Sequence, residues 1–286
     1  MARLAPLALA TMLAACSGPS LLNGIDRVAG SRGAERVADG IAFGTHGQRL
    51  DVWQPAQGRS LRPIVVFLYG GGWEAGRRQD YGFAGRAFAS KGFVTIVPDY
   101  RKAPANPFPD FMIDAAEAVR WARDHAAEVG GDPDRIALVG HSAGAHIAAL
   151  LALDASHLTR AGVPTGTVKA VVGLAGPYDF LPFDARQAVA AFGHVPAPEV
   201  TQPIRYARAD APPMLLATGD ADTVVRPRNS EALAAAITRA GGRASLRIYP
   251  GMRHEGIVMA LAGPFAGKGP VLNDAATFLS DVMPAK

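Results

Sequence analysis

The sequence predicts an α/β fold with a doubly wound, mostly parallel sheet. Two observations predict it: from residue 50 onward, short apolar runs alternate with longer helical stretches, and several of those stretches end at a glycine. Buried parallel strands are continuous apolar runs, and alternating strands and helices form a parallel sheet because each crossover helix covers one face. At 286 residues, the chain has room for one such domain.

The elements are justified in chain order by their residue types. Each expected strand is a run of mainly β-branched and aromatic residues, as in the Ile-Val-Val-Phe-Leu segment that begins at Ile64. The strands are expected at residues 50–53, 64–68, 94–97, 136–139, 168–174, 214–218 and 246–249, and the helices near residues 84–90, 110–128, 143–153, 230–240 and 272–282. Residues 177–211 are rich in proline and break the alternation. They predict a small cap over the strand ends, with one short helix near 185–192.

Composition and charge exclude several classes of protein. Hydrophobic residues make up 49% of the chain and charged residues 19%, which excludes a disordered chain. The net charge is only +4, and Arg77-Arg78 is the largest basic cluster, far short of a nucleic-acid-binding stripe. A single cysteine excludes a disulfide and a thiolate metal cluster. No His, Asp and Glu cluster has metal-ligand spacing, so we expect no metal and no cofactor.

The N-terminus has the pattern of an exported protein. Arg3 supplies a positive end, and the apolar residues 4–15 are too few to span a bilayer. The junction Leu13-Ala14-Ala15-Cys16 resembles a bacterial lipobox, so Cys16 is expected to be lipidated and to anchor the chain to a membrane of the bacterial cell envelope. The alternative is an ordinary signal peptide and a secreted or periplasmic protein. The expected divisions are a lipoprotein signal peptide (1–15), an anchor and tether rich in Gly, Ser and charge (16–45), and the main α/β domain (46–284).

The segment Gly140-His141-Ser142-Ala143-Gly144 lies between an expected strand and an expected helix. A sharp strand-turn-helix junction of this kind exposes the hydroxyl of its central serine above the sheet, and its glycines leave room for the tight turn. Ser142 is therefore a candidate nucleophile. Taken alone, it could instead be a serine that only caps a helix.

Three glycines follow an earlier expected strand, in the segment Tyr69-Gly70-Gly71-Gly72-Trp73. Consecutive glycines leave backbone N–H groups uncovered, so they can approach a developing oxyanion. A phosphate-binding loop is the weaker interpretation, because neither Gly-Lys-Ser/Thr nor the Gly-X-Gly-X-X-Gly spacing is present.

A serine nucleophile needs a general base and an acid that orients it. Of the histidines downstream of Ser142, namely His146, His157, His194 and His254, only His254 follows a late strand. His146 should point away from the nucleophile, His157 falls in a polar loop, and His194 precedes any suitable acid. Asp220 and Asp222 both follow the preceding strand, and either could be the acid.

Together these segments resemble the α/β-hydrolase superfamily, close to its acetyl-esterase, hormone-sensitive-lipase-like and feruloyl/acetylxylan-esterase-like carboxylesterases. The resemblance covers roughly residues 45–284. It also rests on the segments Asp99-Tyr100-Arg101-Lys102-Ala103-Pro104, Pro107-Phe108-Pro109 and Gly131-Asp132-Pro133-Asp134-Arg135, and on the spacing of Gly219, Asp222 and Val225.

The resemblance implies an activity and the role of each residue. Gly71, Gly72 and Ala143 would donate the oxyanion-hole N–H groups, and Asp222 is preferred over Asp220 as the acid. The implied reaction is hydrolysis of short-chain, acetyl-type carboxylic esters through an acyl-enzyme, with a small-molecule ester as substrate. Tyr69 departs from the family, which usually has His there, but a phenol can also hydrogen-bond to fix the loop.

Two other functions stay open: an arylformamidase-like amide hydrolase, and a surface-anchored binding protein that has lost catalysis. The sequence leaves the oligomeric state open. The short cap predicts a shallow site, with four aromatic residues that either line it or only pack the cap: Trp73, Tyr178, Phe180 and Phe183.

Overall fold

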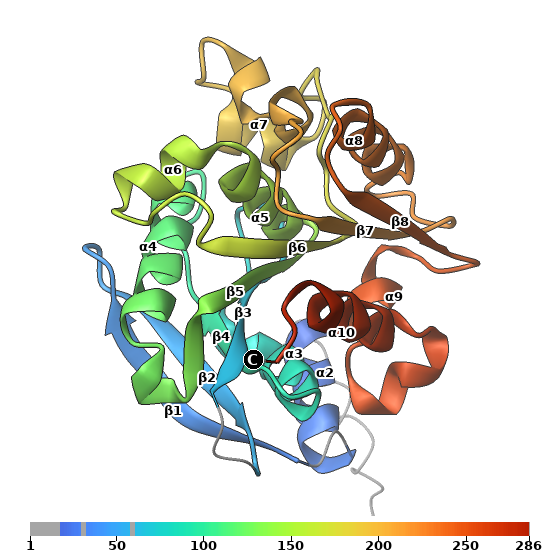
Figure 1. Ribbon diagram of the computed structural model, residues 1–286. Coiled ribbons are helices and arrows are strands. Elements are labelled where there is room, and N and C mark those ends of the chain that lie inside the picture. Colours follow the sequence, from blue (N-terminus) through green and yellow to red (C-terminus); the bar gives the residue numbers. More distant parts are fainter. Residues whose placement is uncertain (1–17, 30–32, 58–60, 286) are drawn as a thin grey trace, which may run out of the picture.

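An eight-stranded sheet crosses the molecule in the computed structural model, which describes residues 18–29, 33–57 and 61–285 (Figure 1). The strand order is β1-β2-β4-β3-β5-β6-β7-β8. The strands are β1 (Ala34–Phe43), β2 (Gln48–Pro55), β3 (Arg62–Leu68), β4 (Val94–Pro98), β5 (Gly131–His141), β6 (Val168–Leu174), β7 (Met214–Gly219) and β8 (Ala244–Tyr249).

The predicted mostly parallel sheet is confirmed. Strands β4, β3, β5, β6, β7 and β8 pair in parallel, whereas β2 is antiparallel to both of its neighbours, β1 and β4. Because the parallel strands all end at the same edge, the loops that follow β3, β5, β7 and β8 lie together there. These loops carry the residues on which the predicted site depends.

Helices cover both faces of the sheet. In Figure 1, α4, α5 and α8 lie on one side, and α3 and α10 on the other. The α-helices are α2 (Gly18–Ala29), α3 (Gly82–Ser90), α4 (Asp110–Asp124), α5 (Ala143–Leu153), α6 (Ala155–Arg160), α7 (Arg186–Phe192), α8 (Arg228–Arg239), α9 (His254–Met259) and α10 (Val271–Val282). Short 3₁₀ turns are η1 (Arg78–Tyr81), η2 (Ala127–Val129), η3 (Pro198–Thr201), η4 (Pro203–Tyr206) and η5 (Gly263–Lys268). The short helix predicted within the cap is α7.

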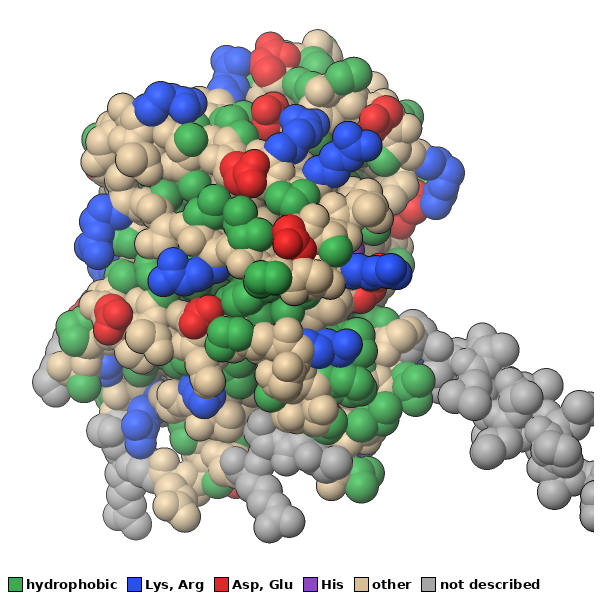
Figure 2. Space-filling view, turned by 90° about the vertical axis from the view of Figure 1, so that its right-hand side faces the viewer, with side chains coloured by type: hydrophobic (Ala, Val, Ile, Leu, Met, Phe, Trp, Pro, Cys, Tyr) green, Lys and Arg blue, Asp and Glu red, His purple; other side chains and the backbone are tan. Residues whose placement is uncertain are grey.

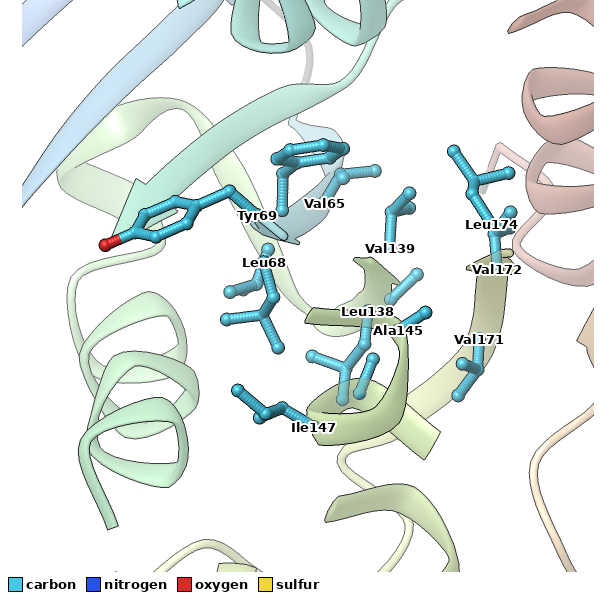
Figure 3. Close-up of a cluster of buried hydrophobic side chains, with 14 of the residues drawn as sticks. Val65, Leu68, Tyr69, Leu138, Val139, Ala145, Ile147, Val171, Val172 and Leu174 are labelled. Carbon is cyan, nitrogen blue, oxygen red and sulfur yellow. The ribbon is translucent and has the colours of Figure 1, made fainter. Parts of the chain in front are cut away.

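The core is built from the central strands and α5, as Figure 3 shows. Leu138 of β5 lies beside Ala145 and Ile147 of α5, whereas Val139 and Val172 point to the opposite face. All five side chains are fully buried. Burial on both faces explains why these strands are continuous apolar runs in the sequence.

Residues 18–29 and 34–43 differ from the predicted tether. They form α2 and β1, and β1 pairs with β2 from Ala34 opposite Pro55 to Phe43 opposite Gln48. Backbone pairing does not require apolar side chains, so the polar composition of this segment did not predict a strand. The folded domain therefore begins well before residue 46. The predicted signal peptide and Cys16 lie outside the described residues.

The surface mixes both signs of charge. On the face shown in Figure 2, Lys and Arg side chains are interspersed with Asp and Glu around apolar patches. Of the basic pair singled out in the sequence, Arg78 is buried, with ion pairs to Asp51 (2.8 Å) and Asp99 (3.1 Å). Among the described helices, none is both long and apolar enough to cross a membrane.

His146 of α5 joins two segments far apart in the sequence. Its Nδ1 accepts a hydrogen bond from the Trp73 indole (3.3 Å), and its Nε2 donates to the Thr201 carbonyl (2.8 Å). Burial lowers the pKa of His146 to about 4. The folded protein therefore holds the His146 imidazole in its neutral form.

This burial predicts a pH dependence of stability. At pH values between the unfolded pKa of about 6.5 and the folded pKa, His146 is protonated in the unfolded chain but neutral in the folded protein. The free energy of unfolding therefore falls as the pH is lowered through this range. His146→Gln should remove about 1.4 kcal/mol per pH unit from that slope between about pH 6 and pH 5. Urea unfolding of both proteins across this range measures the slope. Equal slopes would show that His146 is not buried in its neutral form.

Candidate active site

Ser142 lies in the sharp turn between β5 and α5. Its backbone has φ 53° and ψ −122°, a conformation that non-glycine residues rarely adopt and that costs on the order of 1–3 kcal/mol. The glycines on either side are required by space: a Cβ atom at Gly144 would lie 2.1 Å from the Leu68 carbonyl oxygen, and one at Gly140 would lie 2.3 Å from the Gly144 oxygen. The turn therefore admits no side chains at these two positions.

The structure brings together the three residues predicted to form a triad. The Ser142 hydroxyl donates to His254 Nε2 (2.9 Å), and His254 Nδ1 donates to Asp222 Oδ2 (2.8 Å). They follow β5, β8 and β7 respectively, so they meet at the carboxyl edge of the sheet. His254 is the first residue of α9, where a loop was predicted.

The contacts of Asp220 and Asp222 distinguish the two carboxylates. Asp222 is buried, and its Oδ1 accepts from the backbone N–H groups of Val224 (2.9 Å) and Val225 (2.8 Å). Burial raises the pKa of Asp222, but the hydrogen bond and charge of His254, together with these two N–H groups, outweigh it and lower the pKa. Asp220 is exposed and accepts from the Gly251 N–H (2.6 Å), so it fixes the turn after β8.

His141, which precedes the serine, makes a contact that the sequence did not indicate. Its Nε2 donates to the His254 carbonyl oxygen (3.2 Å), so it ties the turn after β5 to the start of α9. Burial, and then the neighbouring His254, lower the pKa of His141 to about 3 and keep it neutral. His157 lies in α6 rather than in a loop, and His194 contacts the Phe108 carbonyl.

The glycine loop after β3 lies against the same turn. Gly71 and Gly72 have φ values of +125° and +60°, and a Cβ atom at Gly71 would lie 2.4 Å from the Ala75 carbonyl oxygen. Within the described chain, the N–H groups of Gly71, Gly72 and Ala143 have no hydrogen-bond acceptor, and all three residues line the cavity above Ser142. The loop thus offers uncovered donors beside the serine hydroxyl.

Tyr69 anchors this loop in place of the usual histidine. Its hydroxyl donates to Asp99 Oδ1 (2.8 Å), which also accepts from the Arg78 N–H (2.8 Å). Its ring stacks on Tyr100 (4.7 Å) and Tyr81 (5.1 Å), and the Tyr100 hydroxyl donates to the Tyr69 carbonyl (2.9 Å). Burial raises the pKa of Tyr69, so the phenol stays a donor.

A cavity of about 980 Å³ opens above Ser142, which corrects the expectation of a shallow site. Its lining includes Trp73, Phe180 and Gln187, and a wall formed by Leu21 and Ile25 of α2. Helix α2 was not predicted, although its apolar residues follow a helical spacing that could have indicated it.

Of the four predicted lining aromatics, Trp73 and Phe180 line the cavity. Tyr178 is fully buried beneath it, and Phe183 stacks on Phe192 (5.6 Å).

One group of side chains has the geometry of a metal site. Ligand atoms of His46, Asp114 and Glu117 lie within 4.8 Å of one another. Arg101 donates to both Asp114 oxygens, and Thr45 donates to both Glu117 oxygens. A metal ion would have to compete with the guanidinium charge, so we assign this group a structural role.

Two solved structures with the same fold are named as esterases. A thermostable esterase from Pseudomonas putida superposes with a TM-score of 0.78 at 23% identity, covering 97% of this chain and 96% of that one. The propionate-bound esterase Est2 from Thermogutta terrifontis has a TM-score of 0.69 at 26% identity, covering 89% and 97%.

Curated relatives of similar sequence are also named as esterases. Esterase LipQ of Mycobacterium tuberculosis is 32% identical over 73% of this chain and 54% of its own length. A probable isoprenylcysteine alpha-carbonyl methylesterase of rice, Oryza sativa, is 28% identical over 79% and 59%. The chain thus spans about half to three fifths of such relatives. The family profile named BD-FAE matches residues 50–237, a segment that holds the glycine loop, Ser142 and Asp222. The chain therefore belongs to the BD-FAE family of α/β-hydrolase esterases.

Proposed function

We propose that the protein hydrolyses carboxylic esters, with Ser142 as nucleophile, His254 as general base and Asp222 as the acid that orients it. The observation that carries the proposal is the continuous hydrogen-bonded chain from Ser142 to His254 to Asp222, beside the three uncovered N–H groups. The esterase names of its relatives and structural neighbours support the same reaction class.

In this proposal, each step of ester hydrolysis is assigned to residues of the site. His254 accepts the Ser142 proton as the hydroxyl attacks the ester carbonyl, and the resulting oxyanion accepts from the N–H groups of Gly71, Gly72 and Ala143. His254 then returns the proton to the leaving alcohol, and water hydrolyses the acyl-enzyme by the same path. The ionised Asp222 stabilises the imidazolium in both halves.

The acyl group is short in this proposal. The leaving oxygen must reach His254 Nε2, so the acyl chain extends away from His254, toward Trp73 and Phe180. That side is filled: Trp73 stacks on Phe180 (5.7 Å) and meets Phe192 edge-on (4.9 Å). A Cβ atom at Gly72 would lie 3.1 Å from the Gln187 side chain, so α7 closes the remaining space.

Three alternatives differ in what they require. An amide hydrolase would use the same triad, so it is separated by substrate choice. A methylesterase acting on a large acid, as the name of the rice relative describes, would place its large group on the crowded side. An inactive binding protein would not need the hydrogen bonds that link Ser142 to His254 and His254 to Asp222.

The first test is hydrolysis of p-nitrophenyl esters from acetate to palmitate, with an anilide as the amide. Activity should be highest from acetate to butyrate, because the aromatic wall excludes longer chains. Ser142→Ala should lower turnover by at least about 10³-fold, since the nucleophile is lost while the backbone turn accepts alanine. A maximum at ten or more carbons would overturn the short-acyl assignment, and faster anilide cleavage would favour the amidase.

The second test compares the two neighbouring carboxylates. Asp222→Asn should lower kcat by about 10⁴-fold, because an amide no longer selects the productive His254 tautomer. Asp220→Asn is the matched control and should cost far less, since its carboxylate contacts only the Gly251 N–H. Steady-state kinetics on p-nitrophenyl acetate measure both. The reverse ranking would assign the acid to Asp220.

We also propose that Cys16 carries a lipid that anchors the protein in the bacterial cell envelope. The support is the lipobox-like sequence alone. Cys16→Ser should shift the protein from the membrane to the soluble fraction, or stall processing of its signal peptide, because a serine cannot form the thioether. Fractionation and mass spectrometry of the mature N-terminus measure this. A soluble wild-type protein that begins elsewhere would contradict the proposal.

A further inference from the structure

We propose that the wall formed by α2 binds the alcohol portion of the substrate, and that the substrates are short-acyl esters of large, apolar alcohols. This inference rests on the proposed ester hydrolysis and adds the class of alcohol. It follows from how α2 is attached, which side chains it turns to the cavity, and where the leaving group must lie.

Helix α2 is attached to the domain largely through polar groups. Arg86 Nε donates to the buried Asp26 carboxylate (2.6 Å), and Asn23 Nδ2 donates to the Gln79 carbonyl (2.7 Å). Ser20 Oγ donates to Asp80 (2.5 Å). Leu22 is the buried apolar contact.

Two further apolar residues of α2 are turned toward the cavity instead of the core. Leu21 and Ile25, one helical turn apart, are 44% and 38% exposed and line the cavity. A surface helix ordinarily packs its apolar stripe on the core and leaves its polar face in water. Here polar groups make most of the attachment, so an apolar ligand in the cavity would cover what the fold leaves open.

This wall lies on the His254 side of the cavity. Helix α9 begins at His254 and contributes Val258 and Met259 to the lining, and the adjacent η5 contributes Phe265. The η5 turn is tied to α2, because the Gly263 N–H donates to Asp26 Oδ1 (3.1 Å).

The chemistry places the alcohol on this side. His254 must protonate the leaving oxygen, so the alcohol portion departs along the wall that His254 shares with α2. The side chains from α2, α9 and η5 that line it are mostly hydrocarbon, namely Leu21, Leu22, Ile25, Val258, Met259 and Phe265. Glu255, Arg226 and Arg228 also line the cavity. A sugar alcohol needs several hydrogen-bond partners, whereas an alkyl or terpenoid chain needs only this apolar surface.

The experiment varies the alcohol and keeps the acyl group constant. Ethyl acetate, hexyl acetate and an acetylated sugar are compared with the wild type and with the double variant Leu21→Ser/Ile25→Ser. Val28→Ser is the matched control, because Val28 is on the same helix and 91% exposed but does not line the cavity. Leu21→Met/Ile25→Met keeps the wall apolar. Thermal unfolding checks that all variants are folded.

The wild type should prefer hexyl over ethyl acetate in kcat/KM by about tenfold or more. The serine double variant should lower that ratio about tenfold, mainly through KM. The methionine variant should restore it, and Val28→Ser should leave it as in the wild type. Three results would each overturn the inference while leaving ester hydrolysis intact. They are equal kcat/KM for ethyl and hexyl acetate, an unchanged ratio in the serine double variant, and a preference for the acetylated sugar. Failure to cleave any ester would overturn both.

Discussion

The close approach of two backbone turns at the carboxyl ends of β3 and β5 is the constraint on which the site depends. Gly144 packs against the carbonyl of Leu68, and a Cβ atom at Gly70 would lie 3.0 Å from the Ser142 Cβ. No side chain fits between the turns. As a result the serine hydroxyl and the uncovered N–H groups occupy one small region. Donors fixed in this way need no reorganisation when charge develops on the substrate.

The surrounding polar network keeps that approach fixed. Tyr69 and the Arg78 backbone N–H share Asp99 as acceptor, and the Arg78 guanidinium bridges Asp99 to Asp51 of β2. The loop between β3 and η1 is thereby tied to the segments around β2 and β4. Removing one member would leave a buried charge without its partner, which is costly. The Tyr69 phenol, held by Asp99, thus fixes the glycine loop at the position where the families that the sequence resembles usually have histidine.

The sequence was sufficient for the parts of the molecule that depend on local signals. The turn around Ser142 could be predicted because its glycines are obligatory, and His254 because it was the one downstream histidine placed after a late strand. Both interpretations agree with the observed contacts. The choice of Asp222 over Asp220 needed a family resemblance, since both follow β7 and only the folded structure shows that Asp222 meets His254.

The parts that escaped prediction depend on distant partners. β1 exists because of its pairing with β2, and the position of α2 depends on Arg86, about sixty residues away, so local sequence did not place either element in the domain. The contact of His141 with the His254 carbonyl likewise joins residues more than a hundred positions apart. The size of the cavity was underestimated for the same reason: one of its walls comes from a segment that looked like a linker.

The attachment of α2 by Asp26 and Arg86 has a consequence for how substrate arrives. Gly18, the first described residue of α2, lines the cavity and is two residues from Cys16, so their Cα atoms can be at most about 7 Å apart. If Cys16 is acylated, as proposed, this part of the cavity wall would lie close to the headgroup layer of the bilayer. Apolar esters dissolve in that layer far better than in water. The enzyme would then sample the surface concentration of its substrate, and its rate would follow lateral diffusion in the lipid instead of solubility in the aqueous phase.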